Sequence, residues 1–79
     1  MLLVQVRENE LGLSRLGLIV PKRFIPLSVD RNLMKRLVRE WFRLRQVALK
    51  GRDVLVRVSG PREVGKGLGE ELDRLGLPK

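Results

Sequence analysis

The chain is short and strongly basic, and it contains no cysteine or histidine. Its 79 residues suffice for one small domain (1–79), which buries only a little over about 60% of its unfolded surface. Seventeen lysines and arginines against nine acids give a net charge of +8, which favours a polyanionic partner, either nucleic acid or an anionic membrane. The lack of Cys and His excludes disulfides, the usual zinc sites and histidine-activated nucleophiles. No apolar run approaches a membrane span of about 18 residues and no signal peptide is recognised, so we expect a cytoplasmic protein.

Two strands are predicted at the start of the chain. Apolar residues alternate between Leu2 and Arg7 with the period of two that is typical of a half-buried strand. The alternation returns in RLGLIV (15–20), after the turn signal ENELG. We expect the two strands to form an antiparallel hairpin that ends at Pro21.

A long amphipathic helix is predicted next, in the segment VDRNLMKRLVREWFRLR (29–45). Ser28 or Asp30 is the expected N-cap, and Gly51 is expected to end the helix after Lys50. With a step of about 100° per residue, one arc of this helix is apolar and is expected to pack on the sheet. This arc contains Leu33, Met34, Leu37, Val38, Trp41, Leu44 and Ala48.

The opposite arc of the helix is basic. Its members are Arg31, Asn32, Lys35, Arg36, Arg39 and Arg43. Four of these cations repeat at i,i+4, a spacing at which like charges repel, whereas a merely solvated face normally mixes charges of both signs. A phosphate backbone would relieve the repulsion, since arginine gives forked hydrogen bonds and Asn32 can contact phosphate or base.

The last two predicted elements are a strand from Asp53 to Ser59 and a short helix carrying Val64, Leu68, Leu72 and Leu75. Glycines weaken this helix by about 1 kcal/mol each relative to alanine. The order β-β-α-β-α predicts an α/β (α+β) two-layer sandwich, with a small sheet and one long basic helix.

The segment GPREVGKG (60–67) nearly matches a nucleotide-binding P-loop. However, Gly67 replaces the Ser or Thr that would hold magnesium, and only twelve residues follow it, so we interpret the segment as a turn. Five of the nine acids are scattered over predicted turns and caps: Glu8, Glu10, Asp30, Glu40 and Asp53. We therefore assign no catalytic residue and no metal ligand.

The helix and the strand before it resemble the bacterial ribonuclease P protein family. RNLMKRLVRE is similar to the helix motif R-N-R-x-K-R-x-x-R-[EQ], and RLGLIVPKR is similar to the preceding strand; the match covers roughly Leu2 to Pro61. The resemblance implies the family's sandwich, a ribosomal protein S5 domain 2-like topology with a left-handed crossover. It also implies a subunit that binds no cofactor alone and assists a catalytic RNA, which uses magnesium, in removing the 5′ leader of precursor tRNA.

The resemblance also implies roles for particular residues. The RNA-binding set would be Arg31, Asn32, Lys35, Arg36, Arg39 and Arg43, together with Lys22 and Arg23. We assign Arg7, Arg15, Arg57 and Phe24 to a surface for the leader. Leu33 stands where the motif commonly has Arg, and the family's N-terminal helix has no counterpart, so we expect the leader to be gripped less completely than in the family. Weak self-association is a further expectation, through a mixed sheet face with Leu3, Ile19 and Leu55.

Two alternatives stay open at this point. Another small basic RNA-binding protein, ribosomal or RNA-chaperone-like, would share this composition. A membrane-surface helix with Trp41 at an anionic interface is the weaker alternative, because the helix lies between hydrophobic strands and its apolar arc should be consumed by the core.

Overall fold

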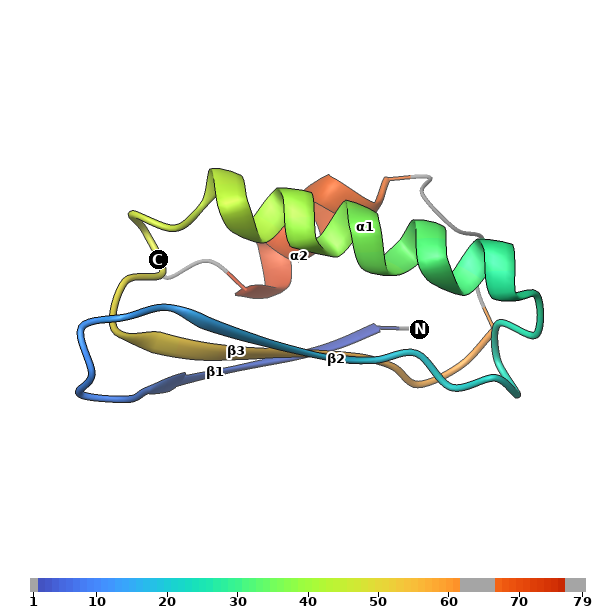
Figure 1. The fold of residues 1–79 in the computed structure, drawn as a ribbon, viewed down its shortest axis with the longest axis horizontal. Coiled ribbons are helices and arrows are strands. Elements are labelled where there is room, and N and C mark those ends of the chain that lie inside the picture. The colour runs from blue at the N-terminus through green and yellow to red at the C-terminus, as the bar shows by residue number, and fades with distance from the viewer. Residues whose placement is uncertain (1, 62–66, 77–79) are drawn as a thin grey trace.

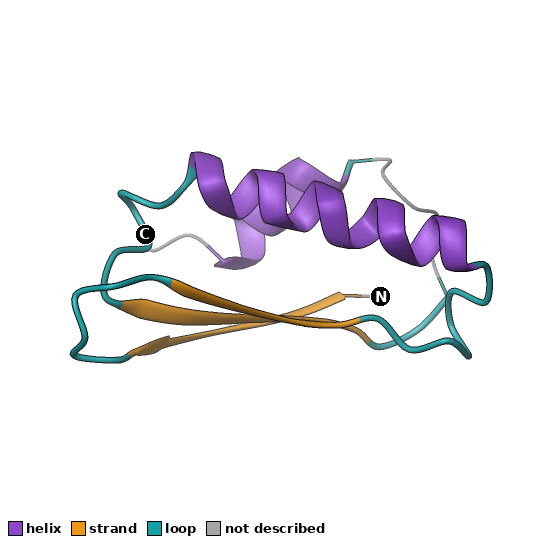
Figure 2. Cartoon of the chain, in the orientation of Figure 1, coloured by secondary structure: helices purple, strands orange, loops and turns teal. Residues whose placement is uncertain are grey.

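The computed structural model describes residues 2–61 and 67–76, which form a three-stranded sheet with both helices on one of its faces (Figure 1). Figure 2 shows the same two layers by secondary structure. The elements are β1 (Leu2–Glu8), β2 (Arg15–Ile19), α1 (Ser28–Leu44), β3 (Arg52–Val58) and α2 (Leu68–Gly76). The predicted order β-β-α-β-α and the two-layer architecture are confirmed. Within the described residues, neither helix combines the length and the apolar character needed to cross a membrane.

The predicted antiparallel hairpin is wrong, because β3 lies between the first two strands. The sheet order is β1-β3-β2, with β1 antiparallel to β3 and β2 parallel to it. The segment 9–14 therefore spans two strand spacings, about 10 Å, instead of making a tight turn. Central placement suits β3, whose Val54, Val56 and Val58 are all buried and would be poorly covered at an edge.

The core lies between the sheet and the two helices. From α1 it takes Met34, Val38, Trp41 and Phe42. The predicted apolar arc is thus correct at its centre and wrong at both ends. Leu33 is half-exposed and lies outside the core, Leu44 is 59% exposed, and Ala48 follows the helix. Phe42, outside the predicted arc, takes part in the core instead.

Both ends of α1 differ from the prediction. Leu27 is the N-cap and no side chain caps the helix, so Ser28 and Asp30 lie inside its first turn. The helix ends at Leu44 rather than Lys50, and the turn that follows carries Leu49 into the core with no exposed surface. If α1 continued to Lys50, Leu49 would be carried along the helix and its burial in the core would be opposed. Gly51, with φ +76°, then leads into β3, a conformation that glycine adopts without strain.

A polar clasp joins α2 to the end of α1. The Trp41 indole Nε1 donates to Asp73 Oδ1 at 2.7 Å, and Arg45 donates to both oxygens of the same carboxylate at 3.0 Å. The Arg45 guanidinium and the Trp41 indole hold the pKa of Asp73 below its usual value. The predicted last helix is confirmed from Leu68, whereas Val64 and most of the GPREVGKG turn lie outside the described residues.

Candidate nucleic-acid interface

The side of α1 that faces away from the sheet carries three cations that form no ion pair within the described part of the chain. Arg36 and Arg39 are exposed and Lys35 is half-buried, and none forms an ion pair with any acid in residues 2–61 and 67–76. Asn32, one turn before Arg36, is also exposed. These four residues, which we call the basic face, share one side of a straight helix whose opposite side is fixed in the core.

The other two cations of the predicted arc are bonded within the protein. Arg31 Nη1 donates to the carbonyl oxygens of Ile25 at 3.0 Å and Pro26 at 2.8 Å. Arg43 pairs with Glu40, one turn earlier. Its Nε donates to Oε2 at 3.2 Å, and its Nη2 donates to Oε1. Hydrogen bonding by Arg43 lowers the pKa of Glu40. The expectation of unrelieved repulsion is therefore wrong at Arg43, and the i,i+3 spacing of this pair was a signal present in the sequence.

Lys22, Arg23 and Phe24 form the turn that follows β2. Lys22 and Arg23 are exposed, and the guanidinium carbon of Arg23 lies 4.7 Å from the centre of the Phe24 ring. Phe24 is half-buried and packs against the core. The Phe24 ring thus contacts the core and the Arg23 guanidinium. The structure does not bring Phe24 together with the other residues assigned to the leader surface.

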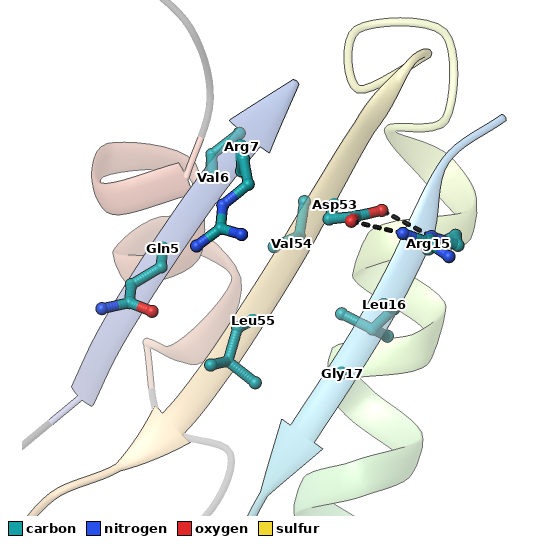
Figure 3. A pocket seen from close by; sticks show the side chains of 9 residues that line it. All are labelled: Gln5, Val6, Arg7, Arg15, Leu16, Gly17, Asp53, Val54 and Leu55. Atoms are coloured by element: carbon teal, nitrogen blue, oxygen red, sulfur yellow. Dashed lines mark hydrogen bonds and ion pairs between the residues drawn. The ribbon is translucent and has the colours of Figure 1, made fainter. Parts of the chain in front are cut away.

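Those other residues lie together on the face of the sheet opposite the helices, which we call the open face. The register places Arg7 and Arg15 on either side of Asp53, and places Leu3 and Ile19 on either side of Arg57. All three arginines are exposed. Between these two rows lie Gln5, Leu55 and Gly17, which line a hollow of about 530 Å³ together with neighbouring strand residues (Figure 3).

Asp53 neutralises part of the positive charge of the open face. Arg15 donates to its two carboxylate oxygens at 2.7 and 2.6 Å, and Asn9 Nδ2 donates at 2.9 Å. These bonds, first that of Arg15 and then that of Asn9, lower the pKa of Asp53 to about 2. The roles of Asp53 and Asn9 were missed in the sequence because they depend on β3 pairing with both β1 and β2, which are far from it in the chain.

Comparison with known proteins agrees with this arrangement. The family model described as Ribonuclease P matches residues 1–73. The ribonuclease P protein component of Pseudomonas putida (strain GB-1) is 45% identical over 69 residues, covering 87% of this chain and 47% of that protein. The corresponding protein of Halorhodospira halophila is 47% identical over 57 residues, covering 72% of this chain and 47% of the relative. This chain thus spans about half the length of these curated relatives.

A solved structure shares the fold. It is that of the RNase P protein from Thermotoga maritima in complex with 1-(4-fluorophenyl)-2-thiourea, with a TM-score of 0.64 and 40% sequence identity. The similarity covers 92% of this chain and 63% of that one. Family model, sequence relatives and fold all agree, and the chain belongs to the ribonuclease P protein family.

Proposed function

We propose that this protein is the RNA-binding subunit of ribonuclease P, which assists a catalytic RNA in removing the 5′ leader from precursor tRNA in the cytoplasm. The observation that carries the proposal is the basic face. Lys35, Arg36 and Arg39 form no ion pair with any acid among the described residues, and they occupy motif positions in a chain of this family. Three cations on one side of a rigid helix, without an ion pair in the described part of the chain, suit contact with the phosphate backbone of a structured RNA.

The open face supports contact with a second RNA segment, the leader. Its net charge is positive, because Arg7, Arg15 and Arg57 outnumber Asp53. Figure 1 shows α1 on one side of the sheet, and the open face is the other side of the sheet. Because α1 packs on the sheet through its core residues, its basic face points away from the open face, and the protein can contact two RNA segments at once. The positive charge of the open face also favours RNA as its partner over a second copy of the chain, because a second copy would bring like charges together. Light scattering at high protein concentration tests for the self-association expected above.

The division of labour follows from chemistry. The chain has no His or Cys, and the described residues contain no group of three or more acids that could hold a metal ion. We therefore assign bond cleavage and magnesium binding to the RNA. The protein would lower repulsion between two polyanions, and so reduce the magnesium that the reaction requires.

The test combines purified protein, catalytic RNA and precursor tRNA at low magnesium. We expect faster cleavage with protein than without, and no cleavage by protein alone. The absence of stimulation at every magnesium concentration would reject the proposal, and cleavage by the protein alone would reject the division of labour. A membrane-surface role has no support, because Trp41 is only 4% exposed and cannot enter a bilayer without unfolding the core.

A further inference from the structure

Next to the basic face, α1 presents apolar side chains to solvent. Val29 is 74% exposed, and Leu33, one turn later, is half-exposed. Both line an open hollow of about 720 Å³ on the outer side of the helix, together with Asn32, Arg36, Arg39, Glu40 and Arg43. A single exposed apolar residue needs no explanation, but this pair adjoins an exposed amide and cations that form no ion pair with any described residue.

The hollow has two chemically different ends. Val29, Leu33 and Asn32 form its N-terminal end, and the Glu40–Arg43 ion pair closes the other. Between them lie Arg36 and Arg39, which have no acidic partner among the described residues. The rise of about 1.5 Å per residue puts Arg36 and Arg39 roughly 5 and 9 Å beyond Leu33 along the helix axis.

A duplex does not fit such a surface well. In A-form RNA the major groove is too deep and narrow for side chains to read, and the wide minor groove displays polar 2′-hydroxyls and base edges. A base stacked within a duplex exposes no face to an apolar side chain. An unpaired nucleotide offers three groups: an apolar base face, polar base edges and flanking phosphates. The hollow has a partner for each of these groups. Val29 and Leu33 can contact the base face, the Asn32 amide can bond a base edge, and Arg36 and Arg39 can bind the phosphates.

The geometry points to a binding site for one unpaired nucleotide of the partner RNA, with its base resting on Val29 and Leu33 and its phosphates over Arg36 and Arg39. Leu33 is then a base-contacting residue at the position where the family motif commonly has an arginine. This inference rests on the proposed function and adds the class of RNA element that the helix recognises.

The test uses three RNA hairpins of otherwise identical sequence. One is fully paired, one carries a single extra adenosine in its stem, and one carries an abasic nucleotide at the same place. We expect the protein to bind the adenosine hairpin about five- to tenfold more tightly than the other two, which is the effect of removing roughly 40 to 55 Å² of apolar surface from water at about 25 cal/mol per Å². The double variant Val29→Ser/Leu33→Gln, which keeps every charge, should bind all three hairpins equally, with an unchanged salt dependence.

Several outcomes would overturn the inference: no preference for the adenosine hairpin, an equal preference for the abasic one, or a preference that survives in the double variant. Tighter binding to vesicles of phosphatidylcholine and phosphatidylserine, lost in the same variant, would overturn it in favour of a lipid surface. Circular dichroism and urea unfolding verify that the variant is folded, as its exposed positions predict. Failure of the proposed function is recognised separately, as a lack of stimulated cleavage by the unmodified protein.

Discussion

Neutralising the basic face should change the salt dependence of RNA binding, and not only the affinity. The variant Arg36→Gln/Arg39→Gln removes two exposed cations that have no acidic partner among the described residues. The control Lys50→Gln/Arg74→Gln removes the same charge at two exposed positions outside α1. Glutamine keeps helix propensity close to that of arginine, so both variants should fold.

The magnitude follows from counterion release. Each lost phosphate contact lowers the log–log salt slope by about 0.7 for single-stranded and about 0.9 for duplex RNA, so two contacts lower it by about 1.4 to 1.8. Over a fourfold rise in salt, from about 50 to about 200 mM, the unmodified protein should lose about 7- to 12-fold more affinity than the variant does.

Filter binding or fluorescence anisotropy with the catalytic RNA, at four or more salt concentrations, measures the slopes. The control variant should retain the slope of the unmodified protein. Equal reductions in the two variants would refute the reasoning, because they would mean that total charge governs binding and that the arrangement on α1 is irrelevant.

Glu40→Gln should release Arg43 and raise the salt slope by about 0.7 to 0.9, and an unchanged slope would show that Arg43 does not reach phosphate. Met34→Ala, at a fully buried position, should lower the free energy of unfolding by about 2 to 5 kcal/mol in urea titrations, whereas Val47→Ala, at an exposed position, should change it by less than about 0.5 kcal/mol. The lowered pKa of Asp53 stabilises the folded state above about pH 4, and this contribution is lost as the pH falls towards 2. Asp53→Asn should therefore flatten the acid limb of stability measured by urea midpoints; an identical acid limb in both proteins would contradict the assigned pairing.

Local patterns predicted the elements well, because their causes are local. The period of two in β1 and β3 and the apolar spacing around Val38 depend on neighbouring residues alone, and the strands and α1 lie close to the predicted positions. The end of α1 was not predictable in this way. It depends on the burial of Leu49, which requires the sheet to be in place.

The sequence predicted which positions belong to the candidate site, but not which of its cations are free of bonds within the described part of the protein and can bind RNA. Arg31, Arg36 and Arg39 look alike in the sequence, yet Arg31 is held by two backbone carbonyls. Its acceptors lie in the turn before α1, whose shape no local pattern specified. Similarly, the neutralisation of Arg15 by Asp53 requires the parallel pairing of β2 with β3, two segments whose pairing no local pattern specifies.

The central position of β3 has a consequence for how the chain reaches its folded state. Leu2 is paired with Val58, so the sheet has no complete ladder until all of residues 2–58 are available. During synthesis β1 and β2 leave the ribosome with no strand between them, while α1 can form its local hydrogen bonds at once. The sheet therefore forms only when β3 pairs with β1 and β2. Contacts between segments so far apart in the chain give a high contact order, which slows folding and leaves the edges of β1 and β2 open to other chains in the meantime.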